Sequence, residues 1–386
     1  MWTTTMLTDD MVHKLVGMGD NELGLSIVRT ILEHDSGNWS RAVSNLQEAK
    51  AYGSNVKILA SPWTPPLSMK TENTNVGGHL RADAYDDYAA HLNDYISYMS
   101  GQGVTIDVVS IQNEPDIEVS YDSCDWTADE LRNFARDYAD SITGAQVMAS
   151  ESFRYNPAYT DPILNDSTAR GNVDIIGGHL YGCEASGYFH EYALAESHNK
   201  PVWMTEYLMH EADGGGAAIW GDPSNQAVWD ETLDGMLRGV HMSLEYNWSA
   251  YIWWWARRFY SFLGDGDSQF GTTLGEVLKR GWAFSQYAKF VRPGYQRIGV
   301  STESAYSSLY ITAYEGDGKI VFVMLNRSTE SFSNVVFEIP NGVTSAEAYV
   351  TSRTAAREAV SITSAGKYAT LESIPERSVL TVVMSY

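Results

Sequence analysis

The sequence predicts an α/β protein: a (β/α)8 TIM-type barrel with a C-terminal side β-sandwich domain. Three observations support this fold class. Buried apolar strands alternate with helices, which is typical of a parallel sheet with crossover helices. Polar and aromatic residues directly follow the strands, at the edge where such barrels carry their functional groups. After Arg292-Pro293-Gly294 only strand patterns remain. We therefore expect a barrel over residues 1–292 and an all-β side domain over residues 293–386.

The barrel strands are predicted from short apolar or β-branched runs. They cover Leu25–Arg29, Val56–Ala60, Val104–Ile111, Gln146–Ala149, Val173–Ile176, Pro201–Thr205 and Ala250–Trp255. The predicted helices cover Thr8–Met18, Trp39–Tyr52, Asp86–Met99, Thr127–Ile142, Gln226–Tyr246 and Glu276–Phe290. Seven strands are visible where a closed barrel needs eight. The missing strand should precede Leu25, where the sequence shows no strand pattern, so we expect it to be absent or irregular.

The side domain is predicted from a second set of strand patterns, joined by turn residues such as Gly316-Asp317-Gly318. These strands cover Leu309–Tyr314, Lys319–Leu325, Val335–Ile339, Ala346–Val350, Tyr368–Ile374 and Val379–Ser385.

Composition excludes several classes of partner. The 386 residues carry 26 Lys+Arg and 49 Asp+Glu, a net charge of −23, which disfavours nucleic acid and anionic membranes. No apolar run reaches the roughly 20 residues of a membrane span. The content of 12 Trp and 24 Tyr is high for a chain of this length. Their flat faces suit sugar rings, although a large barrel also uses aromatic residues in its core.

The motifs of several enzyme classes are missing from the sequence. There is no HExxH, G-x-S-x-G, P-loop or G-x-G-x-x-G pattern. Cys124 and Cys183 form no CxxC pair and no disulfide framework, so we expect two free thiols. Both follow predicted strands on the same face, and a disulfide between them is the alternative. We predict that the protein needs neither a metal ion nor a cofactor.

Two glutamates stand where buried strands end. Glu114 follows Val108–Ile111 after Gln112 and Asn113, and Pro115 then prevents further strand pairing. Glu206 directly follows the strand at residues 201–205. The alternative, that Asn113 and Glu114 merely cap the next element, remains open on spacing alone.

Two carboxyl groups about 5–5.5 Å apart across a barrel mouth would suit retaining glycoside hydrolysis. One protonates the leaving oxygen and needs a raised pKa, while the other attacks carbon and must stay ionised. Asn113 could bind a sugar hydroxyl, and Arg29 could keep the nucleophile anionic. The structural alternative for Asn113 is that it caps the next element. For Arg29 it is a salt bridge that closes the rim of the barrel. Other barrel hydrolases, and a carbohydrate-binding protein on a barrel scaffold, are the alternative functions.

Several runs of residues resemble motifs of glycoside hydrolase family 30, with the bacterial endoxylanase (glucuronoxylanase-like) branch closest. They are Ser110-Ile111-Gln112-Asn113-Glu114-Pro115-Asp116, Trp203-Met204-Thr205-Glu206, Ser61-Pro62-Trp63, His179-Leu180-Tyr181-Gly182, Tyr251-Ile252-Trp253-Trp254 and Lys289-Phe290-Val291-Arg292-Pro293-Gly294-Tyr295.

The resemblance implies a retaining endo-β-1,4-xylanase in which Glu114 is the acid/base and Glu206 the nucleophile. It also implies which residues line the sugar site: Asn113, Arg29, Trp63, His179, Tyr181 and Trp253. The expected partners are xylan and xylooligosaccharides, and we expect a secreted monomer.

Two departures from the family pattern concern specificity. The family's tyrosine pair after the nucleophile is replaced by Leu208 and Met209, and an acidic, longer loop follows. The segment after Arg257 and Arg258 is also longer and acidic. Because acidic side chains repel a uronate carboxylate, we expect weak or no dependence on glucuronate branches. A strict glucuronoxylan-specific endoxylanase and a β-glucanase or glucosidase are the alternatives.

Overall fold

The computed structural model describes residues 7–53, 55–210 and 220–386. The chain divides into two compact units. The first holds residues 1–12, 27–207 and 246–254, and the second holds residues 13–26, 208–245 and 255–386. The predicted boundary at residues 292 and 293 stays a prediction. None of the helices in the described ranges is long and apolar enough to cross a membrane.

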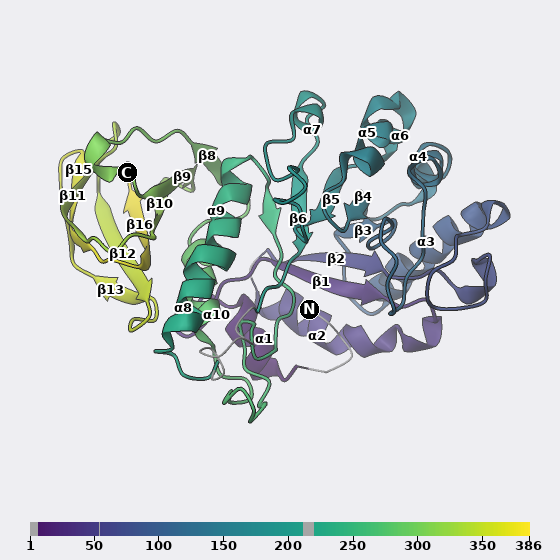
Figure 1. The fold of residues 1–386 in the computed structure, drawn as a ribbon, viewed down its shortest axis with the longest axis horizontal. Helices are drawn as coiled ribbons and strands as arrows, with labels where there is room; N and C mark the ends of the chain where they lie inside the picture. The colour runs from purple at the N-terminus through teal and green to yellow at the C-terminus, as the bar shows by residue number, and fades with distance from the viewer. Residues whose placement is uncertain (1–6, 54, 211–219) are drawn as a thin grey trace. The chain divides into compact units, whose positions relative to one another are not determined.

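A parallel sheet of seven strands in the order β1 to β7 forms the centre of the first unit (Figure 1). The strands are β1 (Ile27–Leu32), β2 (Lys57–Pro62), β3 (Val108–Ser110), β4 (Gln146–Ser152), β5 (Ile175–His179), β6 (Val202–Glu206) and β7 (Ala250–Tyr251). Within the described residues the sheet has no strand before β1. The predicted parallel sheet of a TIM-type barrel is confirmed, with seven of the eight expected strands among the described residues.

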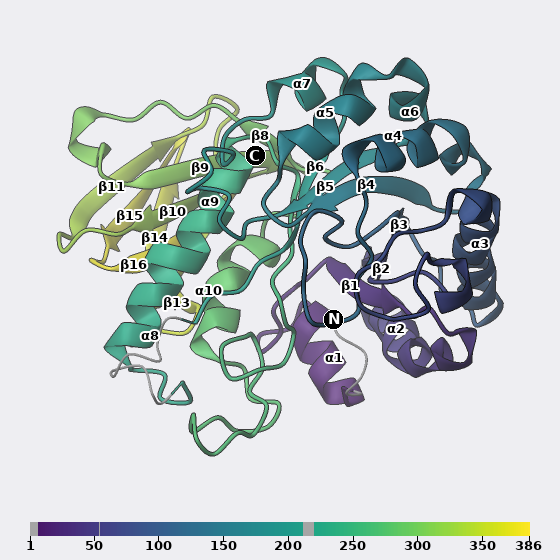
Figure 2. The ribbon, with the colours of Figure 1, turned by 45° about the vertical axis from the view of Figure 1, so that its right-hand side comes forward.

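Helices follow the strands of this unit on its outer side (Figure 2). They are α2 (Ser40–Tyr52), α3 (Tyr85–Gly101), α4 (Ala128–Asp137), α5 (Pro157–Asn165), α6 (Ser167–Asn172) and α7 (Ala193–Ser197). Helix α1 (Asp9–Val16) precedes β1 and belongs partly to each unit. The predicted capping box is present: Thr127 accepts from the backbone N–H of Glu130, whose side chain accepts from the N–H of Thr127.

Two predicted strands and one predicted helix of this unit are shorter than expected. The strand over Val104–Ile111 is limited to β3, and that over Ala250–Trp255 is limited to β7. The helix expected to reach Ile142 ends at Asp137, and a 3₁₀ turn over Ala139–Ser141 follows. Apolar periodicity continues into these buried flanking segments, so it could not reveal where regular pairing stops.

The second unit combines helices with an antiparallel β-sandwich. Its helices are α8 (Gln226–Glu231), a π-helical segment η6 (Thr232–Leu237), α9 (Arg238–Glu245) and α10 (Lys279–Ala288). The predicted single helix over Gln226–Tyr246 thus contains a π segment, and the one predicted over Glu276–Phe290 is three residues shorter at its start and two at its end.

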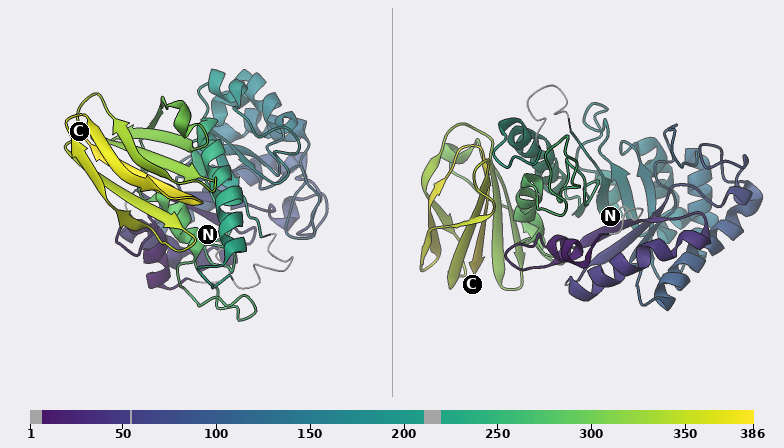
Figure 3. Two further views of the ribbon diagram at one scale, coloured as in Figure 1. Left: turned by 60° about the vertical axis from the view of Figure 1, so that its left-hand side comes forward. Right: turned by 90° about the horizontal axis from the view of Figure 1, so that it is seen from below.

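The sandwich consists of a six-stranded sheet, β13-β12-β16-β10-β9-β8, and a three-stranded sheet, β11-β15-β14 (Figure 3). The strands are β8 (Gln296–Ile298), β9 (Tyr310–Gly316), β10 (Lys319–Asn326), β11 (Phe332–Glu338), β12 (Ser345–Ser352), β13 (Glu358–Val360), β14 (Ile362–Ala365), β15 (Tyr368–Ile374) and β16 (Ser378–Ser385). Both sheets contribute to one apolar core, which includes Phe322, Phe337 and Leu371. The predicted side β-sandwich is confirmed.

Candidate active site

All the residues predicted to form the site lie in the first unit, and all but Arg29 lie at or just after the carboxyl ends of its strands. The strand predicted to end at Arg29 continues to Leu32, so Arg29 lies inside it. Arg29 lies on β1, Trp63 follows β2, and Asn113 and Glu114 follow β3. His179 ends β5 and Glu206 ends β6. Parallel strands place these ends at one edge of the sheet, so residues far apart in the sequence meet there.

Local irregularities turn the key side chains toward this edge. Glu114 and Glu151 both have a φ of 47°, in the left-handed region that residues with a side chain rarely adopt. The pairing of β4 with β5 shifts register between Ser150 and Ser152, and that of β5 with β6 shifts next to His179. Such bulges re-aim side chains beside functional sites, and left-handed residues of this kind store about 1–3 kcal/mol each.

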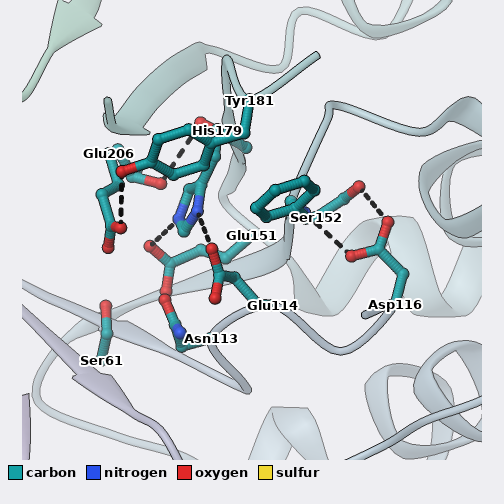
Figure 4. Close-up of polar contacts among 12 residues, drawn as sticks. Ser61, Asn113, Glu114, Asp116, Glu151, Ser152, His179, Tyr181 and Glu206 are labelled. Carbon is teal, nitrogen blue, oxygen red and sulfur yellow. Dashed lines mark hydrogen bonds and ion pairs between the residues drawn. The ribbon is translucent and has the colours of Figure 1, made fainter. Parts of the chain in front are cut away.

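The two predicted catalytic carboxylates converge on one place (Figure 4). One oxygen of Glu114, one oxygen of Glu206 and a ring nitrogen of His179 lie within 4.8 Å of one another. Glu114 and Glu206 are 4% and 7% exposed, so each is buried but keeps a small contact with solvent. The structural alternative, in which Glu114 only caps the next element, does not explain this convergence.

Arg29 binds three of the polar groups at the site. It donates to Glu206 (Nη1 to Oε2, 2.6 Å) and to Asn113 (Nη2 to Oδ1, 2.5 Å). It also lies 3.2 Å from Glu151. Its guanidinium therefore fixes the predicted nucleophile and the neighbouring amide together, as an anionic nucleophile requires.

Tyr181 donates a hydrogen bond of 3.0 Å to the other oxygen of Glu206. Both oxygens of this carboxylate are thus held by donors. Donors on both oxygens fix the orientation of the carboxylate.

Glu114 is held by two donors as well. His179 Nδ1 lies 3.0 Å from Oε1, and the Tyr121 hydroxyl donates to Oε2 at 2.6 Å. Burial alone would raise the pKa of Glu114, but the hydrogen bonds from His179 and Tyr121 and the charge of Arg29 outweigh it and lower that pKa. The prediction of a raised pKa for the general acid is therefore wrong for Glu114.

The proton that Glu114 lacks resides on His179. Burial would lower the pKa of this imidazole, but the charges of Glu206, Glu114 and Glu151 raise it to about 9. Near neutral pH the Glu114–His179 pair thus holds one proton, and the two groups titrate as a pair. Transfer across the 3.0 Å contact would make Glu114 the acid.

Aromatic rings lie around the carboxylates. Tyr181 contacts Phe153 and Tyr207 at centroid distances of 5.1 and 5.5 Å, and Tyr207 contacts Trp253 edge-on at 6.0 Å. Trp63 packs edge-on against Trp254 at 5.6 Å, with the Arg29 guanidinium 5.9 Å from its ring. The predicted Trp63, Tyr181 and Trp253 are therefore all part of the site's surroundings.

The donor types at the site also suit a divalent cation, because two carboxylates and an imidazole come together. Arg29, however, already bonds to Glu206, and a fixed positive charge there opposes a second cation. The absence of a required metal or cofactor stays a prediction. Cys124 and Cys183 are both free and buried, as expected from the sequence.

Sequence reasoning missed two groups that contact the predicted residues. Glu151 follows the same strand-end pattern that identified Glu114 and Glu206, so a signal for it existed. Tyr121 lies in the loop after β3, and no local pattern distinguishes it from a surface tyrosine. The acidic loop predicted to affect specificity falls largely on residues 211–219, which lie outside the described residues.

Comparison with known proteins agrees with this geometry. Residues 6–257 match the model of the glycosyl hydrolase family 30 TIM-barrel domain. The chain is 36% identical over 331 residues to the glucuronoxylanase XynC of Bacillus subtilis, covering 84% of this chain and 72% of the relative.

Solved structures are similar over the whole chain. The family 30 subfamily 8 xylanase Xyn30A of Clostridium acetobutylicum matches with a TM-score of 0.83 and 30% identity, covering 100% of this chain and 94% of the other. A family 30 endoxylanase of Clostridium papyrosolvens C71 matches with a TM-score of 0.82 and 31% identity, covering 100% and 95%. The chain belongs to glycoside hydrolase family 30.

Proposed function

We propose that this protein is a retaining endo-β-1,4-xylanase that cleaves the xylan backbone by double displacement. The observation that carries the mechanism is the approach of a Glu114 oxygen to a Glu206 oxygen within 4.8 Å. Inverting enzymes need about 6.5–9.5 Å between carboxyl groups for a water molecule, whereas retaining enzymes use about 5–5.5 Å. The substrate class is inferred from the relatives, which carry the names glucuronoxylanase and xylanase.

The first step uses both carboxylates. A Glu206 oxygen bonds to the anomeric carbon while the glycosidic C–O bond breaks, and the leaving oxygen takes the proton of the Glu114–His179 pair. In the second step Glu114 accepts a proton from water, and the water oxygen displaces Glu206 from the anomeric carbon. Each bond formed on carbon replaces one that breaks, so the site needs no other reactant.

Weak or no dependence on glucuronate branches is the proposed specificity. Leu208 and Met209 cannot donate hydrogen bonds from their side chains to a uronate, and one of the two arginines after the last strand of the parallel sheet is already paired. Arg258 lies 3.8 Å from Asp265 in the second unit, which partly neutralises its charge. The name of the Bacillus relative favours the second candidate, a strict glucuronoxylanase.

Product analysis separates these candidates. The protein is assayed on glucuronoxylan, arabinoxylan and unbranched xylooligosaccharides, with Glu206→Gln as the inactive control. Cleavage of all three supports the proposal, and cleavage of glucuronoxylan alone supports the second candidate. Turnover only of β-1,6-glucan or aryl glucosides would overturn the xylanase proposal. Binding of oligosaccharide without any turnover would instead indicate a carbohydrate-binding protein.

We also propose that the protein acts outside the cell as a monomer, since an insoluble polymer cannot be reached from inside. Detection of the protein in culture medium and its mass by light scattering test these two points. A purely intracellular protein or a stable dimer would contradict them.

A further inference from the structure

Glu151 is a third carboxylate at the site, and the double displacement uses only two. It lies near the end of β4 and is fully buried, with 0% exposure. The neighbouring strand leaves space for it: a Cβ added to Gly177 would lie 3.1 Å from the Glu151 Cγ and 2.5 Å from the Met148 sulfur. The fold thus accommodates a buried acid here by omitting a side chain.

The carboxylate of Glu151 is held by charge. Its oxygen Oε1 lies 3.2 Å from Arg29 Nη2 and 3.8 Å from His179 Nε2. Among the described residues, neither of its oxygens accepts a well-formed hydrogen bond. A buried carboxylate without such bonds is costly, and the two cations that face it are the main reason why its charge is retained.

Those two cations are the ones that hold the reacting carboxylates. Arg29 donates to Glu206, and His179 faces Glu114 through its other ring nitrogen. The backbone adds a further link, since the N–H of Glu114 donates to the carbonyl of Glu151 at 3.0 Å. Glu151 therefore contacts the groups that hold both reacting carboxylates, and it is fully buried whereas Glu114 and Glu206 are slightly exposed.

We propose that Glu151 is a positioning residue for the glycosidase reaction: its negative charge keeps the proton on the Glu114–His179 pair and keeps Arg29 directed at Glu206. The proposal rests on the proposed function, in which that proton goes to the leaving group. Glu151 itself is not required to touch the sugar or exchange a proton.

The charges around His179 are consistent with this role. The groups that face it are Glu114 after β3, Glu151 on β4, Glu206 on β6 and the ring of Tyr181. Burial would raise the pKa of Glu151, but Arg29 and then His179 lower it far below its ordinary value. Glu151 therefore stays anionic throughout the working range of pH, unlike a residue that supplies the proton.

The first test is Glu151→Gln, which keeps the shape and removes the charge, beside Glu372→Gln, which removes an exposed charge on β15. We expect the alkaline limb of the kcat/KM profile to move at least about one pH unit lower in Glu151→Gln. In Glu151→Gln the decrease in kcat should be larger than the change in KM, because the proton is transferred in the transition state. Glu151→Asp, which restores the charge, should move the limb back toward the parent.

An unchanged alkaline limb in a folded Glu151→Gln protein would overturn the proposal, as would a Glu151→Asp profile identical to that of Glu151→Gln. A structural role alone would lower stability and leave the shape of the profile unchanged. Glu372→Gln should have the profile of the parent.

A second measurement does not depend on turnover or on the folding of any variant. In the unmodified protein, ¹⁵N NMR of labelled histidine should show one imidazole that stays doubly protonated at pH 8 and titrates near pH 9. If all nine histidines titrate below about pH 7.5, the proposal fails. If the imidazolium is present but no xylan is cleaved, the charge state that the proposal requires stands and the proposed substrate is wrong.

Discussion

Replacing Arg29 with methionine removes the cation shared by Glu151 and Glu206 while keeping a side chain of similar length. Arg29 is 5% exposed, and its two carboxylate partners lie at 3.2 and 2.6 Å. At an effective dielectric constant of about 20, a pair 3.2 Å apart attracts by ~5 kcal/mol before desolvation is subtracted. Removing one member of a buried pair typically costs about 3–5 kcal/mol, because the other charge stays buried alone.

We expect the free energy of unfolding of Arg29→Met to be about 3–5 kcal/mol lower than that of the parent at pH 8. If this free energy falls by about 3 kcal/mol per molar urea, the urea midpoint falls by about 1–2 M. The decrease in the free energy of unfolding should be smaller at pH 5. Without Arg29 the strongest influence that lowers the pKa of Glu151 is gone and only His179 and Ser110 still oppose the effect of burial. The pKa of Glu151 therefore rises, and the variant takes up protons on folding at pH 5 that relieve the buried charge.

Urea unfolding followed by tryptophan fluorescence at pH 5 and pH 8 tests this expectation. Arg41→Met is the matched control, since Arg41 is 55% exposed and lies 3.9 Å from Glu33, and it should change stability by less than about 0.5 kcal/mol. An unchanged midpoint for Arg29→Met at pH 8, or an equal loss at both pH values, would refute the reasoning.

Three further results are expected. Glu206→Ala should abolish turnover while oligosaccharide binding persists in calorimetry; residual turnover above 1% of the parent (roughly 10²-fold slower) would contradict its role. Tyr121→Phe removes a donor to Glu114, so the pKa of Glu114 rises and the alkaline limb of kcat/KM should move to higher pH, not lower. Cys124 and Cys183 are free and buried, so a thiol reagent should react with neither until the protein is denatured, and a reductant should not change the melting temperature.

Much of the fold could be predicted because parallel strands buried on both faces have a distinctive sequence pattern. The strand that ends at Glu206 is apolar until its last two residues, and the structure ends β6 at that same glutamate. Strand boundaries were less predictable. The run that begins at Val104 is mostly buried, yet only Val108–Ser110 pair as a strand.

The site was predictable to the extent that its residues end strands. His179 and Glu206 end strands and Glu114 follows one, and the sheet topology brings them together, whereas Arg29, predicted to end a strand, lies inside β1. Tyr121 reaches the site from a loop, and loop paths depend on packing that sequence periodicity does not encode.

Charge states were not predictable from the residues alone. A general acid is expected to have a raised pKa, but His179 and Tyr121 reverse the direction for Glu114. This reversal depends on the three-dimensional distances of 3.0 and 2.6 Å to groups 65 and 7 residues away. The sequence showed that these groups exist but not that they are in contact.

Trapping the covalent intermediate tests the central claim most directly, namely that Glu114 and Glu206 act on one sugar. The protein is incubated with a 2-fluoro xylobioside bearing a good leaving group, then digested and analysed by mass spectrometry. The account predicts one added disaccharide on the peptide carrying Glu206, formed more slowly, or not at all, in Glu206→Gln. A label on another residue, or turnover with inversion and no adduct, would contradict it.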